Sequence, residues 1–219
     1  MVIVINKYVE GGDGRHIYYI YIHTKKKVQR INKRGQTYQK KMLCKTQKER
    51  NRFVTKWKRE PKTHYLMTTR FNNNTHEQMM EYCSKTAKIR CAYGSFTRMA
   101  SYLPQDVVMF VLEMNNDKNR IMGIGMIRNT LSTKQHFVYN EDVYNTFTYI
   151  GSKRIDRTEM TEVEEAVMEI CDKVCFKGFL HQKRHKALTV FPVDVHEKYK
   201  EDGDLDLTEF VRNMFLERL

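Results

Sequence analysis

Two cysteines and two histidines near the C-terminus have a spacing that could hold a metal ion. A zinc site needs four such ligands converging as a tetrahedron, and the pattern Cys-x3-Cys-x5-His-x3-His supplies Cys171, Cys175, His181 and His185. Both cysteines, however, fall on the apolar stripe of an expected helix, where free cysteine packs as a small hydrophobic side chain. We therefore predict that they belong to the core and that the chain has no metal site, with zinc as the alternative.

Catalytic motifs find little support in the sequence. It has no Ser/His/Asp order, no Walker loop and no zinc-hydrolase signature. Gly123-x-Gly125 falls inside an expected strand, so it is not a phosphate loop. Asp202, Asp204 and Asp206 resemble the start of an EF-hand loop, but the Gly and Glu required further on are missing. We predict a protein that is not an enzyme, without catalytic residues and without a cofactor.

The chemistry that the sequence favours is contact with phosphate. From Lys25 to Lys62 the only acidic residues are Glu49 and Glu60, while Tyr38 and Trp57 interleave with the cations. Such a mixture can neutralise phosphates and stack bases, although a solvated surface arm is the alternative. A second cationic group follows a turn at Gly178 and could be a solvated loop as well. The predicted phosphate-binding residues are Lys25, Lys26, Lys27, Arg30, Lys33, Arg34, Lys183 and Arg184.

Composition points to the same class of partner. The 219 residues include 39 Lys and Arg against 26 Asp and Glu, giving a net charge of +13 and a pI near 9.5. A strongly basic chain is typical of proteins that bind nucleic acid. No apolar run approaches the ~20 residues that span a bilayer, so no membrane partner is expected. Five unpaired cysteines suit a reducing compartment, so we expect an intracellular protein of the cytoplasm or nucleus.

The elements that must position these residues follow from local patterns. Thr46-Gln-Lys-Glu49 and Thr161-Glu-Val-Glu164 are capping boxes that predict helices running to about Trp57 and Cys175. A short helix is expected over 76–85, with Thr75 as its N-cap. Strands are expected over 17–22, 64–70 and 88–93, and an amphipathic helix over 207–219.

Residues 102–129 are the most informative stretch. A Pro104-Gln-Asp106 turn leads into an apolar run, an Asn/Asp/Lys loop follows, and a second apolar run is broken by Gly123 and Gly125. Two apolar runs bounded by turn residues predict a β-hairpin. Glycine inside a strand marks a bulge or the close approach of another group. Asp106 is expected to be structural, because Asp side chains in turns can bond to nearby backbone N–H groups.

Several of these segments resemble the PUA-like barrel superfamily, in particular its EVE and YTH branches. Residues 65–69 (Tyr-Leu-Met-Thr-Thr) are similar to the opening strand of EVE domains, 104–110 to the segment entering their central strand, and 121–127 to the returning strand. Residues 171–192 resemble the C-terminal part of some PUA-like proteins of large DNA viruses. The resemblance covers about 40% of the chain, and residues 30–57 resemble no family that we can name.

The resemblance implies a pocket on the barrel that holds a flipped or single-stranded base. Its expected residues are Thr68, Thr69, Cys91, Tyr93, Ser95 and Tyr102. Tyr93 would stack on the base, while Ser95 and Thr69 would bond to its edge; alternatively, Tyr93 is an ordinary half-buried strand aromatic. YTH domains build their cage with tryptophans, and the only Trp here, Trp57, lies outside the matched region. Specificity for methylated adenosine is therefore not carried over.

These observations predict an α+β fold: a PUA-like (EVE/YTH-type) β-barrel over 62–195, a basic N-terminal extension over 1–61 and a C-terminal helix over 196–219. The expected function is non-catalytic recognition of RNA or single-stranded DNA, with a modified base as the candidate ligand. One alternative is a structural or assembly protein whose basic surface meets an acidic partner or a packaged genome. A nucleic-acid-processing enzyme is the other, and a protein partner stays open in each case.

Overall fold

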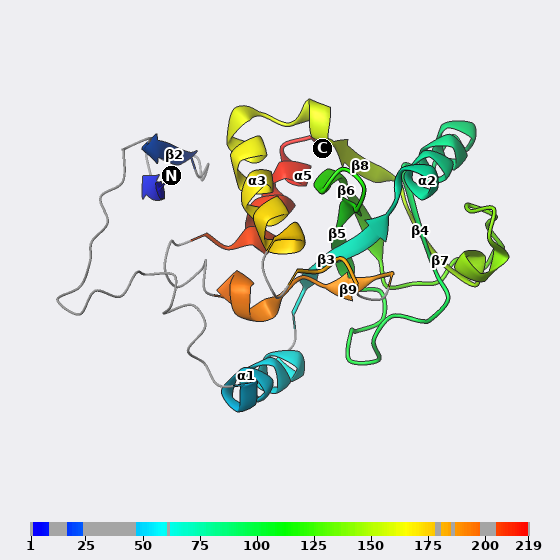
Figure 1. The fold of residues 1–219 in the computed structure, drawn as a ribbon, viewed down its shortest axis with the longest axis horizontal. Helices are drawn as coiled ribbons and strands as arrows, with labels where there is room; N and C mark the ends of the chain where they lie inside the picture. The colour runs from blue at the N-terminus through cyan, green and yellow to red at the C-terminus, as the bar shows by residue number, and fades with distance from the viewer. Residues whose placement is uncertain are drawn as a thin grey trace. The chain divides into compact units, whose positions relative to one another are not determined.

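A computed structural model describes residues 2–8, 17–23, 47–60, 62–177, 181–184, 187–197 and 205–218 (Figure 1). The chain divides into two compact units. The first comprises Met1–Glu60 with Val193–Asp206, and the second comprises Pro61–Pro192 with Leu207–Leu219. This division differs from the expected one at the C-terminal end, where the last helix joins the second unit. No helix among the described residues is long and apolar enough to cross a membrane.

The first unit contains a β-hairpin and a helix. Strand β1 (Val2–Tyr8) pairs antiparallel with β2 (Ile17–His23) along its whole length, from Val2↔His23 to Tyr8↔Ile17. The expected strand over 17–22 is thus confirmed. Helix α1 (Gln47–Arg59) confirms the helix expected from the first capping box, although Thr46 itself lies outside the described residues.

The second unit is built on a five-stranded sheet in the order β8-β6-β5-β3-β9. Its strands are β3 (His64–Phe71), β5 (Val108–Asn115), β6 (Arg120–Arg128), β8 (Lys153–Asp156) and β9 (Thr189–Val190). The central pair β3 and β5 is parallel, and the other pairs are antiparallel. A separate two-stranded sheet joins β4 (Cys91–Ser95) to β7 (Phe147–Gly151).

The predicted α+β class is confirmed, but the described strands do not form a closed barrel. They fall into the separate sheets given above, and no backbone ladder among the described strands joins the β4–β7 pair to the five-stranded sheet. At one edge, β9 is only two residues long. Closure requires a continuous ladder around the sheet, so the PUA-like assignment stays a prediction.

Helices cover both sides of the five-stranded sheet. Helix α3 (Glu162–Phe176) and helix α5 (Leu207–Leu216) lie on one side, and α2 (Asn73–Lys85) lies on the other with the β4–β7 pair (Figure 1). The ring of Phe215 in α5 stacks on Phe110 of β5 at 5.3 Å, which explains why this helix belongs to the second unit. Short 3-10 helices η2 (Asp142–Asn145) and η3 (Arg157–Glu159) complete the unit.

Helix capping follows the sequence closely, with one correction. The box of Thr161 and Glu164 opens α3 as expected. Helix α2 begins three residues earlier than expected, because Asn72 rather than Thr75 is its N-cap. The Asn72 side chain accepts from the Thr75 backbone N–H at 2.8 Å, and the Thr75 hydroxyl bonds back to the Asn72 N–H at 3.0 Å. Asn and Thr are both good N-caps, and the local pattern did not decide between them.

The predicted hairpin is β5–β6, and its two glycines make room for side chains from other strands. A Cβ on Gly125 would lie 1.9 Å from the Tyr93 hydroxyl and 2.7 Å from the Cys91 sulfur. One on Gly123 would lie 2.6 Å from the Arg154 guanidinium. Both are closer than real contacts allow, so the expected close approach is confirmed. The register changes from Leu112↔Ile124 to Met114↔Ile121, so Met122 and Gly123 of β6 together oppose one residue of β5. The bulge expected at a strand glycine is therefore found as well.

Asp106 closes the turn that leads into β5 with a left-handed backbone, φ 60°. Its carboxylate accepts from Arg128 at 3.2 Å and from the Thr130 hydroxyl at 3.2 Å, and its N–H donates to the Asn129 carbonyl. The expected bonds from backbone N–H groups to this carboxylate are not found among the described residues, and the side chains of Arg128 and Thr130 bond to it instead. Asp and Asn tolerate positive φ better than most other residues.

We predict that Asp106→Ala lowers the free energy of unfolding by about 1 kcal/mol. Alanine has a Cβ that is unfavourable in the left-handed region, and it has no polar group to form a compensating local bond. Asp106→Gly should lose less, since glycine adopts this conformation without penalty. Urea denaturation of the two variants measures the difference. An Ala variant as stable as the wild type would show that the turn does not depend on this residue.

Candidate functional site

Five of the six residues expected to line a base pocket lie in the interior of the second unit. Thr68, Cys91 and Tyr93 are 0% exposed, while Thr69 and Ser95 are buried as well. Tyr102, in the loop after β4, is half-buried. Phe71 of β3 lies beside Tyr93, with ring centres 6.4 Å apart, and Thr69 shares the Phe71 face of the strand. Thr68 is on the opposite face, where its hydroxyl bonds to Thr189 and Arg70, so the expected set does not line one pocket.

Tyr93 is engaged by the protein itself. Its hydroxyl donates a hydrogen bond of 2.8 Å to Glu113 Oε1 on β5, and its ring has no exposed surface. Burial and the neighbouring Cys91 and Glu113 raise its pKa well above the ordinary value, so it remains a neutral donor. The expected stacking role is therefore not supported, and the alternative of a half-buried aromatic understates its burial.

Glu113 is the centre of a buried charge cluster that the sequence reasoning missed. It lies opposite the β6 bulge, where Met122 and Gly123 together face this one residue of β5. Arg154 of β8 donates to both of its oxygens, from Nε at 3.1 Å and from Nη2 at 2.7 Å. The third nitrogen of Arg154 donates to Asp156 at 2.8 Å. This forked pairing is the geometry in which a buried Arg–carboxylate interaction is strong.

The cluster keeps both partners charged. Burial alone would raise the pKa of Glu113, but His76, Arg154 and Tyr93 outweigh burial and hold that pKa below its ordinary value. Burial likewise opposes the charge on Arg154, but Glu113 and Asp156 raise the pKa of this guanidinium above its ordinary value. Glu113 is therefore a carboxylate with its hydrogen-bonding oxygens occupied, which suits a structural role better than proton transfer.

Two buried polar atoms near the carboxyl ends of β3 and β5 lack a hydrogen-bond partner among the described residues. His76 Nε2 lies 3.8 Å from Glu113 Oε2, too far for a hydrogen bond. Asn116 Oδ1 is also unsatisfied. Both residues adjoin Phe71, since the His76 ring packs on the Phe71 ring and the Asn116 N–H donates to the Phe71 carbonyl. An ordered water or a polar ligand group at this end of the sheet would satisfy them.

The predicted phosphate-binding residues divide into two groups. Lys25, Lys26, Lys27, Arg30, Lys33 and Arg34 lie outside the described residues. Arg184 is exposed, as a phosphate contact requires. Lys183 is half-buried, with its ammonium 6.0 Å from the centre of the Phe176 ring and its carbonyl accepting from Asn116.

Arg70 on β3 fastens the segment that carries Lys183 and Arg184. Its Nε donates to the Gln182 carbonyl at 2.6 Å, and its other nitrogens donate to the Thr68 hydroxyl and the Ala187 carbonyl. Burial lowers the pKa of Arg70 to about 10, which still leaves it charged at neutral pH. Sequence reasoning missed this residue, and the only signal was a single cation at the end of an apolar strand.

The two cysteines of the Cys/His pattern lie in the core. Cys171 and Cys175 are fully buried in α3, as predicted, and burial raises the pKa of Cys171 to about 12. His181 is half-buried and His185 lies outside the described residues. Within the described ranges, no group of three or more His, Cys, Asp or Glu residues could hold a metal ion.

Comparisons with protein-family models, with curated proteins and with solved structures find no match to this chain. The geometry of the chain itself is therefore the basis for the proposals that follow.

We predict that Tyr93→Phe lowers the free energy of unfolding by about 1.5–3 kcal/mol, the contribution of a hydrogen bond to a charged group. Tyr144→Phe is the matched control, because no hydrogen bond to its hydroxyl occurs within the described residues. Thermal and urea denaturation compare the two. A stacking ring at the surface would instead tolerate Phe without loss of stability, so a neutral Tyr93→Phe would revive the pocket assignment.

A second prediction concerns the buried ion pair of Glu113 and Arg154. Glu113→Gln leaves Arg154 without its main counter-charge, and breaking a buried pair costs about 3–5 kcal/mol. The double variant Glu113→Gln/Arg154→Gln should lose less stability than the sum of the losses of the two single variants.

The same ion pair predicts a dependence of stability on pH. Because the folded-state pKa of Glu113 is lowered, its contribution to the free energy of unfolding is present above the ordinary value of 4.5 and is lost as pH falls through the folded pKa. Unfolding measured against pH should show a weaker acid dependence in the Gln variant; equal dependence would contradict the assignment.

Proposed function

We propose that this protein binds nucleic acid without catalysis and that residues 1–60 supply most of the phosphate contacts. The observation that carries the proposal is the segregation of charge. Residues 1–60 contain 17 Lys and Arg against 4 Asp and Glu, an excess of 13 that equals the net charge of the whole chain. The other 159 residues contain 22 of each sign. A polyanion is therefore attracted to one segment rather than to the whole surface.

Helix α1 carries part of this excess of cations. Positions 48, 52, 56 and 59 are all Lys or Arg, and at 3.6 residues per turn they share one face of the helix. Lys56, Lys58 and Arg59 are exposed. A row of cations along one helix face can follow a phosphate backbone. Trp57, which the sequence suggested as a stacking residue, is only 8% exposed, so its present position does not favour stacking.

The second unit uses much of its negative charge internally. Glu165 and Asp172 of α3 both pair with the buried Arg157 of η3, and the Arg157 Nη1 donates to the Ile121 carbonyl at 3.0 Å. Glu164 pairs with Arg218 at 2.7 Å. These ion pairs fasten α3 to β6 and to the C-terminal end, so they hold the fold together and leave a surface of both signs.

The charge alone supports binding to any polyanion, and the resemblance favours RNA or single-stranded DNA. An assembly protein that coats a packaged genome would use the same cations without preference for sequence or strandedness. The affinities for single-stranded RNA, single-stranded DNA and duplex DNA of equal length therefore distinguish a protein that recognises one kind of strand from one that coats any nucleic acid. Incubation of each labelled strand with the protein and Mg²⁺ tests the enzymatic alternative by the appearance of shorter products.

We predict that reversing Lys25, Lys26, Lys27, Arg30, Lys33 and Arg34 to Glu lowers affinity and flattens its dependence on salt. Each phosphate contact contributes about 0.9 to the log–log slope for duplex DNA and about 0.7 for single strands. Fluorescence anisotropy with labelled oligonucleotides over a salt series gives both quantities.

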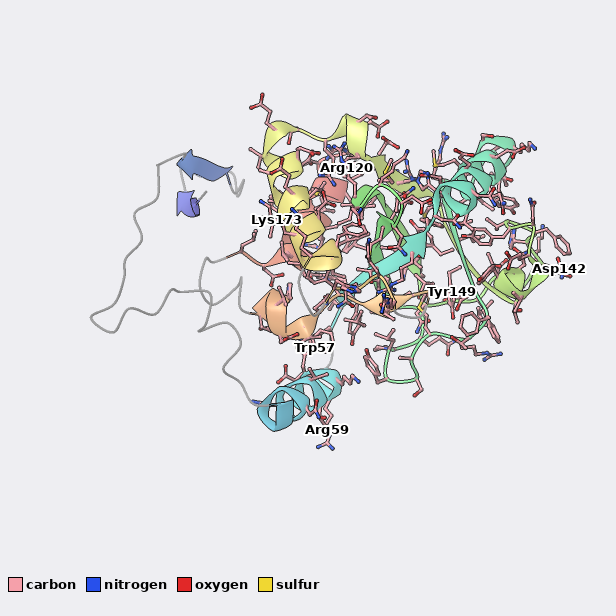
Figure 2. The ribbon with its side chains drawn as sticks, viewed as in Figure 1. Trp57, Arg59, Arg120, Asp142, Tyr149 and Lys173 are labelled. Carbon is pink, nitrogen blue, oxygen red and sulfur yellow. The ribbon has the colours of Figure 1, made fainter. Side chains whose placement is uncertain are left out.

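The matched control reverses six exposed cations of the second unit that form no ion pair with any described residue: Lys88, Arg90, Lys118, Lys153, Lys173 and Lys177. Lys173 is labelled in Figure 2 on α3. Each reversal lowers the net charge by two, so the net charge of both variants changes from +13 to +1. A larger loss from the first variant supports the proposal. Equal losses would mean that net charge, not the segment, governs binding, and no binding by the wild type would refute it.

A further inference from the structure

Exposed apolar side chains gather at one end of the β4–β7 pair. Among the described residues, the exposed large apolar side chains are Phe96, Phe137, Val143, Val163 and Leu216. The first three come from the two loops 96–107 and 129–146, and their exposed fractions are 47%, 63% and 53%. Single exposed apolar residues are ordinary, but a contiguous group indicates an interaction surface.

These three residues are neighbours around Gly94. A Cβ on Gly94 would lie 2.1 Å from the Tyr144 carbonyl and 2.6 Å from the Tyr139 ring. Val143 adjoins Tyr144 in η2, Phe137 precedes Tyr139 by two residues, and Phe96 follows Gly94 by two residues. All three therefore lie within two residues of one tight contact, and we call them, with their charged neighbours, the Phe137 patch.

The backbone that carries the patch is held in place from inside. The buried Asn145 accepts from the N–H groups of Val138 and Tyr139 at 2.9 and 3.0 Å, and its amide donates to the Tyr139 carbonyl at 2.7 Å. The Tyr139 hydroxyl donates to the Ala92 carbonyl at 3.2 Å. A surface that is already ordered loses little conformational entropy when it binds a partner.

The charged residues of the patch have both signs. Arg98 and Lys134 are exposed cations, and Glu141 and Asp142 are exposed anions; Figure 2 shows Asp142 at the outer edge of η2. The Arg98 guanidinium lies 5.4 Å from the centre of the Phe147 ring. None of the four forms an ion pair with a described residue. Opposite charges thus lie on one surface without neutralising each other inside the chain.

We propose that the Phe137 patch binds a second copy of this chain. A two-fold dimer presents the same surface to itself, so the cations of one copy can face the anions of the other around the apolar centre. The anions Glu141 and Asp142 oppose a phosphate strand, and residues 61–219 have no net charge to attract one. The dimer proposal does not rest on the nucleic-acid proposal, since its residues lie in the second unit and not in residues 1–60.

The test is sedimentation equilibrium of the full chain over a range of concentrations. We expect a monomer–dimer equilibrium for the wild type and a dissociation constant at least about tenfold weaker for Phe137→Glu, as for loss of an aromatic anchor at an interface. Val163→Glu, an exposed apolar position on α3, is the control and should leave the equilibrium unchanged. Circular dichroism and thermal melting verify that each variant is folded.

A charge-swap experiment tests the dimer contact in a second way. Arg98→Glu and the double variant Glu141→Lys/Asp142→Lys should each dimerise weakly alone and associate when mixed, because the new charges are again opposite.

A wild type that stays monomeric at every concentration overturns the proposal, and so does a dimer that Phe137→Glu leaves intact. A monomeric wild type whose oligonucleotide affinity falls with Phe137→Glu would assign the patch to nucleic acid instead. A dimer that binds no oligonucleotide would support this inference while refuting the proposed function.

Discussion

A carboxylate removed from water is costly unless cations and hydrogen-bond donors surround it, and Glu113 imposes this requirement on four strands of the second unit. Glu113 stands on β5 opposite the β6 bulge, β8 supplies the forked Arg154 and β4 supplies the Tyr93 hydroxyl. Gly123 and Gly125 leave on β6 the space that these two side chains occupy. The β4–β7 pair shares no hydrogen-bonded ladder with the five-stranded sheet, so this cluster is one of the interactions that fix its position.

The same cluster decides where a ligand can bind. Tyr93 and Glu113 are fully buried, the Arg154 side chain is nearly so, and each has hydrogen bonds inside the protein. A base held where the resemblance implies would have to displace Tyr93 from Glu113 and leave a buried carboxylate short of a donor. The unsatisfied His76 and Asn116 lie at the edge of this region instead, near the carboxyl ends of a parallel strand pair. Recognition of a small group there would leave the ion pair intact.

Sequence patterns were informative wherever the structure depends on neighbours in the chain. The capping box at Thr161, the hairpin of β5 and β6 and the buried stripe of α3 are all local, and all are confirmed. Glu113 was missed because it stands in an apolar run and its partner, Arg154, is 41 residues away. The glycines of β6 indicated a close approach but not the group that approaches. The sheet topology, with β3 parallel to β5, depends on pairing between distant segments, which no local pattern specifies.

Charge segregation also limits how two copies can meet. Each copy brings an excess of 13 positive charges in residues 1–60, and like charges repel over a Debye length of about 8 Å at physiological salt. A dimer interface therefore has to lie on a surface of balanced charge, and the Phe137 patch has that balance. A polyanion bound to these cations would remove the repulsion, and by linkage a dimer would bind a long polyanion more tightly than a monomer does. Dimerisation and polyanion binding, although they use different residues, would then reinforce each other.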